Sequence, residues 1–280
     1  MIKQQIKKST FQNWNKNRRI TLYLGICYIL LMFAVTIWSW HIQKNEYLIK
    51  LTNLSKEEIN FLYSHNLVAS PLALFWKVTL TFTWVSNFAM GLSMILFAIY
   101  PNDWKTQRAM HLTTSYVTIT FLVFWGLIFV PSILKDRIDV EHLISTSIVH
   151  FVTPIMGIVA FVLNRKRIKT TKWTILLAMI PLTAYYFFAL IVFLIGKDLT
   201  TPFNHLKSDS NFDAYIDLSI YPFANFLKPL FYKGGNLGVI VFLDIFVLLA
   251  LCSIAIFFAW FWAKICKIQK DTVTKPWAVN

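Results

Sequence analysis

Six long apolar runs constrain the fold of this 280-residue chain more than any other feature of its sequence. A helix needs about 20 apolar residues to cross the ~30 Å hydrocarbon core of a membrane, because each residue advances it by about 1.5 Å. The runs that satisfy this requirement lie at about 20–40, 72–100, 110–131, 143–163, 172–195 and 237–263. They predict an all-α fold, a polytopic integral membrane bundle of six transmembrane helices.

The composition excludes a water-soluble globule. Hydrophobic residues make up 57% of the chain and charged residues only 14%, whereas soluble domains carry about 25% charged residues. The net charge of +14 comes from basic residues in short connections beside apolar runs, which favours a membrane topology over a nucleic acid partner. Three cysteines without C-x-x-C spacing (Cys27, Cys252 and Cys266) predict neither a structural metal nor a disulfide framework, and we expect no cofactor.

The distribution of Lys and Arg predicts the orientation. Seventeen basic residues and two acidic residues fall in the segments 1–19, 101–109, 164–172 and 264–280. The other three connections together carry nine basic and ten acidic residues. Basic residues remain on the cytoplasmic side of cell membranes, so both termini are predicted to be cytoplasmic. The domains are then a basic N-terminal segment 1–19, a transmembrane domain 20–263 and a cytoplasmic tail 264–280.

Two charged residues lie within the predicted spans, Lys77 in the second and Asp244 in the sixth. A charge at mid-bilayer costs at least about 2.5 kcal/mol, so such residues usually face the bundle interior. With His150 of the fourth span, both lie roughly 8–11 Å below the outer entry points of their helices. This common depth predicts a polar chamber that opens outward. Alternatively, the long side chain of Lys77 extends to the interface.

Polar stripes on three spans have two interpretations. Spacings of three and four residues place each set on one helix face. The sets are Thr79, Thr83, Ser86 and Asn87; Thr146, Ser147, His150 and Thr153; and His111, Thr114, Ser115 and Thr118. They line a functional cavity, or they join helices by hydrogen bonds, as hydroxyl and amide side chains commonly do in membranes. His111 is expected to be interfacial rather than catalytic.

The connection 196–236 is not uniformly polar, because residues 219–227 are apolar and aromatic and include Tyr221. One interpretation is an aromatic belt at the membrane interface. The other is a lid or re-entrant segment over a cavity, where protein or water satisfies the backbone.

Three short motifs resemble those of the bacterial six-helix membrane proteins related to the androgen-induced-gene family. Residues 82–87 (FTWVSN) resemble its F-T-x-x-S-N signature, and residues 150–154 (HFVTP) its histidine-to-proline signature. Residues 221–223 (YPF) are similar to its segment before the last helix. The resemblance covers about 72–263 and implies six helices. From the animal relatives it implies hydrolysis of a lipid ester, with Thr83 as the nucleophile and His150 as the base; Thr81 is an alternative register.

The corresponding mechanism requires a base within hydrogen-bond reach of the threonine hydroxyl, which is a poor nucleophile by itself. Imidazole titrates near neutral pH, so His150 suits this role. Asn87 or Ser86 would donate to the developing oxyanion. Asp244 would orient the imidazole or pair with Lys77.

Two other functions remain open from the sequence. The first is a small-solute or lipid transporter, or a lipid-binding protein, in which Lys77, His150 and Asp244 form a binding or relay set. The second is a non-catalytic membrane scaffold in which the polar stripes only join helices. In every case the expected partners are membrane lipids, with a hydrophobic ester as the substrate in the enzymatic case.

Overall fold

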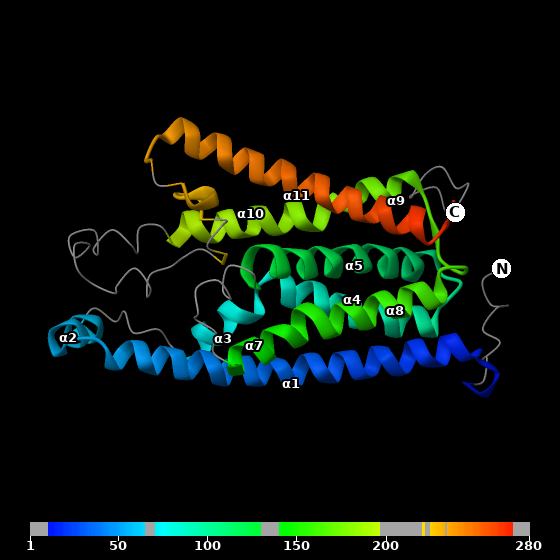
Figure 1. The fold of residues 1–280 in the computed structure, drawn as a ribbon, viewed down its shortest axis with the longest axis horizontal. Helices are drawn as coiled ribbons and strands as arrows, with labels where there is room; N and C mark the ends of the chain where they lie inside the picture. Colours follow the sequence, from blue (N-terminus) through cyan, green and yellow to red (C-terminus); the bar gives the residue numbers. More distant parts are fainter. Residues whose placement is uncertain are drawn as a thin grey trace. The chain divides into compact units, whose positions relative to one another are not determined.

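The computed structural model describes residues 11–64, 71–129, 140–196, 220–221, 225–232 and 234–270, and it confirms an all-α chain (Figure 1). The α-helices are α1 (Lys16–Thr52), α2 (Lys56–Ser64), α3 (Pro71–Thr79), α4 (Phe82–Ile99), α5 (Trp104–Val123), α7 (Val140–Ser147), α8 (Thr153–Asn164), α9 (Lys172–Leu177), α10 (Met179–Gly196) and α11 (Leu237–Ile265). Two π-helical turns, η2 (Phe124–Phe129) and η3 (Ile148–Val152), continue α5 and α7. Short 3-10 turns lie at Phe11–Asn13 and Pro229–Phe231.

Five of the helical segments among the described residues are long and apolar enough to cross a membrane, which indicates a membrane protein. They are Lys16–Ile49, Phe82–Ile99, Val140–Asn164, Lys172–Gly196 and Leu237–Ile265. The remaining predicted span, 110–131, coincides with α5 and η2 up to Phe129. Its helix carries too many Thr, Ser, His and Gln side chains to meet the same criterion. Six spans therefore stay a prediction.

The predicted second span is divided at Leu80 and Thr81, where α3 ends and α4 begins. The hydroxyls of Thr79 and Thr81 donate to backbone carbonyls three or four residues earlier, at 3.0–3.3 Å. Such bonds compete with the helix ladder and bend helices. The carbonyl of Leu80 accepts instead from the Tyr185 hydroxyl at 3.0 Å. The break thus exposes backbone polar groups that side chains satisfy.

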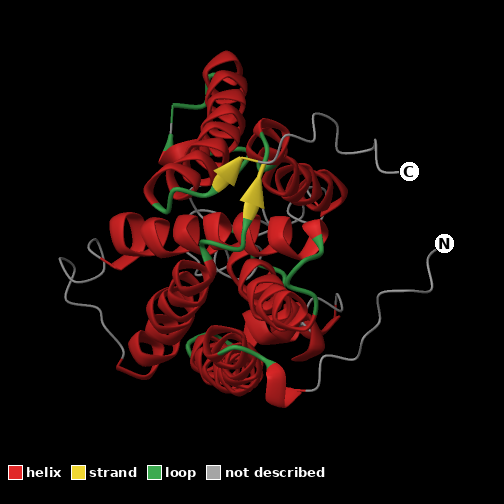
Figure 2. Cartoon of the chain, turned by 90° about the vertical axis from the view of Figure 1, so that its right-hand side faces the viewer, coloured by secondary structure: helices red, strands yellow, loops and turns green. Residues whose placement is uncertain are grey.

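The chain divides into two compact units. The first contains the described residues of Met1–Val35, Ser86–Leu176 and Phe258–Asn280, and the second those of Thr36–Val85 and Leu177–Phe257. In the first unit α5 packs along α8, as Figure 1 shows, and twelve of its twenty residues are buried. Two short strands, β1 (Lys169–Thr170) and β2 (Gln269–Lys270), pair in parallel beside it (Figure 2). The apolar-run pattern did not predict this pair.

The second unit has its own small core. Tyr186 and Phe193 of α10 pack with Phe226 and with Val247 of α11. The Tyr186 ring meets Phe226 edge-on, with centroids 5.4 Å apart. Much of the rest of α10 and α11 is apolar and exposed, as expected for helix surfaces that face lipid.

Candidate functional site

His150 lies in the π-helical turn η3, in the first unit. Its side chain is only 9% exposed, and its ring stacks on Phe124 with centroids 4.4 Å apart. Nδ1 lies 3.3 Å from the carbonyl oxygen of Thr120. A carbonyl only accepts, so this contact places the proton on Nδ1 and leaves a lone pair on Nε2. Nε2 has no hydrogen-bond partner in the described part of the chain. This is the tautomer that a general base requires.

The π turn follows from the sequence beside His150. The N–H of Thr153 donates to the carbonyl of Ile148, five residues earlier. The same pattern would pair residue 154 with the carbonyl of Val149, but Pro154 has no N–H. Asn87 of α4 takes its place, since its Nδ2 donates to Val149 at 3.3 Å. Such turns occur frequently at functional sites.

Asn87 is also the centre of a polar node that joins three helices. Its Oδ1 accepts from the Tyr28 hydroxyl of α1 at 2.6 Å and from the Thr153 hydroxyl of α8 at 2.7 Å. Asn87, Tyr28 and Thr153 are all 0% exposed. The polar stripes predicted on the second and fourth spans therefore meet at Asn87 and Thr153. The neighbouring Ser86 is buried too, at 2% exposure.

Thr83 lies in the second unit, in the first turn of α4, and is 5% exposed. Its N–H donates to the hydroxyl oxygen of Tyr221 at 3.3 Å. The Tyr221 hydroxyl also interacts with the side chains of Thr83 and Thr81, so both candidate nucleophiles contact one phenol. Burial raises the pKa of Tyr221, which keeps this phenol protonated at neutral pH. Its ring lies 6.5 Å from that of Tyr185.

The two predicted intramembrane charges are not paired with each other. Lys77 is exposed on α3, and no ion pair joins it to Asp244 among the described residues. Asp244 is partly buried on α11, and its backbone carbonyl accepts from the Tyr186 hydroxyl at 3.1 Å. Most of the predicted lid segment 196–236 lies outside the described residues; Tyr221 and residues 225–232 lie within them.

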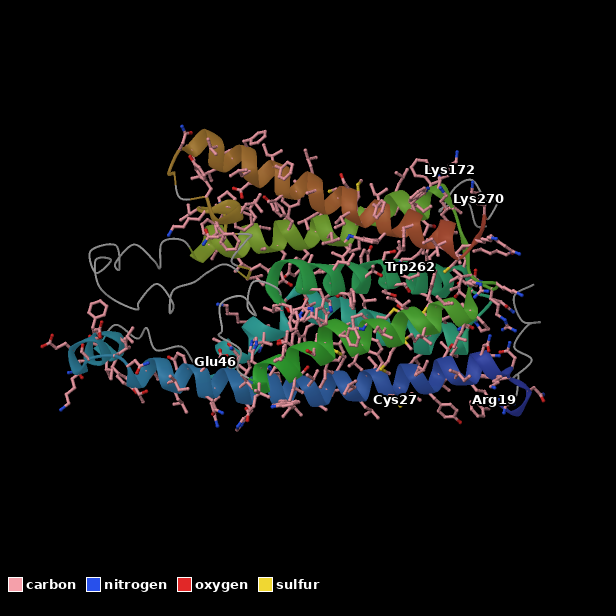
Figure 3. The ribbon with its side chains drawn as sticks, in the orientation of Figure 1. Arg19, Cys27, Glu46, Lys172, Trp262 and Lys270 are labelled. Carbon is pink, nitrogen blue, oxygen red and sulfur yellow. The ribbon has the colours of Figure 1, made fainter. Side chains whose placement is uncertain are left out.

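The polar stripe on α5 serves packing in the first unit. His111, expected to be interfacial, is fully buried; Nε2 contacts the Ala259 carbonyl at 2.8 Å and Nδ1 the Thr170 hydroxyl at 3.1 Å. The indole of Trp262, labelled in Figure 3, donates to the Thr118 hydroxyl at 2.9 Å. These contacts fix the end of α11 and β1 to α5.

Sequence reasoning missed Tyr28 and Tyr185. Each lies in an apolar run, and each donates its hydroxyl to a polar group on or beside α4. A tyrosine in such a run is a usable signal, because its buried hydroxyl normally needs a partner.

Among the described residues, no three His, Cys, Asp or Glu side chains are grouped as a metal site would require. Comparison with protein-family models, curated proteins and solved structures found no match.

Proposed function

We propose that this chain is an intramembrane hydrolase or acyl-transfer enzyme that acts on a lipid ester, with Thr83 as its nucleophile and His150 as its base. The proposal includes the relationship to the androgen-induced-gene family.

The proposal also includes six spans in the cell membrane with both termini cytoplasmic. The sixth span would be α5 with η2, whose 26 residues reach about 39 Å. A fluorescent reporter that folds only in the cytoplasm should fluoresce when fused after Asn280; a dark, stably expressed fusion would contradict this orientation.

One observation carries the proposal: α4 contacts both of the other motif segments. In the second unit Thr83 meets Tyr221, and in the first unit Asn87 meets Val149 and Thr153 beside His150. Residues of the three motifs that lie far apart in sequence are therefore in contact, Thr83 with Tyr221 and Asn87 with Thr153. The environment of His150 adds support, because a carbonyl holds Nδ1–H and leaves Nε2 able to accept a proton.

The chemistry assigns one step to each group. The Thr83 hydroxyl attacks the ester carbonyl while Nε2 of His150 takes its proton, which forms a tetrahedral oxyanion. The protonated Tyr221 hydroxyl is a suitable donor to that oxyanion. Collapse breaks the bond to the alcohol, which leaves with the proton from His150. Water, activated by the same imidazole, then hydrolyses the threonyl ester and restores the hydroxyl; an alcohol in place of water gives acyl transfer.

A fluorophosphonate probe tests this assignment on the purified protein. Labelling is expected at Thr83 and should be lost in Thr83→Ala and reduced at least tenfold in His150→Gln. The matched controls are Thr79→Ala, whose hydroxyl bonds only its own helix, and His41→Gln, an exposed histidine on α1. Both should label like the unmodified chain. Labelling that persists in both Thr83→Ala and His150→Gln contradicts the mechanism, and loss in Thr81→Ala alone moves the nucleophile to Thr81.

A non-catalytic scaffold is the second candidate, and the node at Asn87 favours it. Both acceptor positions of Oδ1 are used by buried donors, and Nδ2 donates to a carbonyl. Asn87 thus serves helix packing, as in a protein whose polar groups only join helices. If no ester or probe reacts, while Thr83→Ala and His150→Gln leave a complex that co-purifies with the chain intact, the scaffold replaces the enzyme.

A further inference from the structure

One end of the first unit is strongly basic. Its described residues include thirteen lysines and arginines: Lys16, Arg18, Arg19, Lys105, Arg108, Arg165, Lys166, Arg167, Lys169, Lys172, Lys264, Lys267 and Lys270. These cations lie in four chain segments, 11–19, 101–109, 164–172 and 264–270. Asp103 is the only acidic residue in these four described segments. Its carboxylate accepts from the backbone N–H of Lys105 and caps α5.

Hydrogen bonds hold these four segments together. Arg18 donates to the carbonyls of Ala98 and Ile99 at the end of α4. Asn17 donates to the Leu163 carbonyl at the end of α8, at 2.9 Å. The side chain of Gln107 accepts from the N–H of Lys169 at 3.0 Å.

The pairing of β1 with β2 joins the segment that follows α11 to the other three basic segments. Figure 3 shows Arg19, Lys172 and Lys270, which come from three of these segments, at the same end. The cations are thus brought together by the fold and are not merely frequent in the sequence.

Aromatic side chains lie among these cations. The guanidinium of Arg108 lies 4.3 Å from the ring centre of Trp104, and the ammonium of Lys264 lies 4.8 Å from that of Trp260. Trp173 and Trp260 are each 45% exposed. Tryptophan beside lysine or arginine is typical of the headgroup layer of a membrane, where the ring meets the acyl boundary and the cation meets phosphate.

Lys267 places a further cation at this end, in an unusual backbone conformation. It follows α11 with φ 51°, in the left-handed conformation that glycine usually adopts at the ends of helices. The N–H of Ile268 closes this turn by donating to the Ala263 carbonyl at 2.9 Å. A lysine is strained at this position, so the capping geometry does not explain its presence.

From this arrangement we propose that the basic end binds the phosphate headgroups of anionic phospholipids. The exposed run Arg165–Arg167, with Lys169 and Lys172, supplies cations next to Trp173. A phosphodiester gains charge-assisted hydrogen bonds from the arginine guanidiniums. Zwitterionic lipids carry a compensating cation and gain less. The inference is independent of the proposed enzyme, because it uses neither Thr83 nor His150.

Native mass spectrometry of the full chain in a neutral detergent tests this proposal. The titrants are short-chain phosphatidylglycerol and phosphatidylcholine, and phosphatidylglycerol is expected to bind more tightly. Each juxtamembrane cation contributes about fivefold to anionic lipid binding. The triple substitution Arg165→Gln, Lys166→Gln, Arg167→Gln should therefore weaken phosphatidylglycerol at least tenfold and leave phosphatidylcholine unchanged. The control removes three exposed lysines of the second unit, Lys44→Gln, Lys56→Gln and Lys228→Gln, and should stay within twofold.

Three results would overturn the proposal. The first is equal binding of the two lipids by the unmodified chain. The second is an equal loss of phosphatidylglycerol affinity in the control variant, which would show that binding depends only on the net charge of the chain. The third is displacement of phosphatidylglycerol by inorganic phosphate at equal concentration and constant ionic strength, which would make the site one for free phosphate. Unchanged phosphatidylcholine binding and melting temperature show that each variant is folded.

Discussion

Helices α5 and α11 show opposite relations between polarity and burial. Twelve of the twenty residues of α5 are buried, and these include six threonines and serines, a glutamine and a histidine. By contrast, α11 is almost wholly apolar between Leu237 and Ala263, and large side chains such as Phe242 and Leu249 are at least 60% exposed. In a water-soluble protein the apolar helix would be the buried one.

The difference shows that an apolar helix surface in this chain faces lipid and not the protein interior. An apolar side chain gains little by leaving lipid, so helices associate through close packing and hydrogen bonds instead. Polar groups such as those of α5 are costly in lipid unless partnered, and protein supplies the partners. Among the five candidate spans in the described residues, hydropathy is therefore highest in α11, which is also the least buried, while the largely buried α5 fails the hydropathy test.

Asn87→Leu should produce the largest loss of stability, because it removes the node beside α5. Leucine has a similar size but removes three buried hydrogen bonds, those of Asn87 with the Tyr28 hydroxyl, the Thr153 hydroxyl and the Val149 carbonyl. The Thr153 hydroxyl keeps its contacts with the carbonyls of Ile148 and Val149, both at 3.1 Å. A buried hydrogen bond contributes about 1 kcal/mol, so we expect a loss of about 3–4 kcal/mol. Unfolding in SDS measures it. Ser253→Ala on α11 is the control, since this hydroxyl is exposed and bonds its own helix. A cost below 1 kcal/mol for Asn87→Leu would show that the node is not structural.

Truncation of one large side chain on each helix compares the two environments directly. Met110 on α5 is 0% exposed, and Met110→Ala should cost about 2–4 kcal/mol because it leaves a cavity. Leu249 on α11 is 60% exposed, and Leu249→Ala should cost about 0.5 kcal/mol, since lipid fills the space. Unfolding in SDS again gives both values. Equal costs would mean that Leu249 packs against protein, for example in an oligomer.

The sequence predicted the positions of the helices well, because apolar runs and their spacing carry that information locally. It also selected Asn87, His150 and Thr83, which the structure places in buried contacts. Their partners were not predictable, since the contacts of Tyr28 and Tyr221 join segments 59 and 138 residues apart. The π turn at His150 was missed because it depends on Pro154 together with a donor from another helix. The full burial of His111 was missed because its position at the start of the predicted span 110–131 suggested the membrane interface.

Two glycines give the smallest effect and the sharpest test of close packing. A Cβ on Gly157 of α8 would lie 2.9 Å from the Cε and Cγ atoms of Met90, whereas a Cβ on Gly126 of η2 would meet no atom within 4 Å. Small residues at protein-facing positions let helices approach closely. Gly157→Ala should therefore cost about 1 kcal/mol, because the strain of moving Met90 outweighs the gain in helix propensity. Gly126→Ala should be neutral or slightly stabilising. Melting temperatures in one detergent rank the two variants. If Gly157→Ala melts at or above the unmodified chain, Met90 adapts without strain, and α4 and α8 approach each other without needing the glycine.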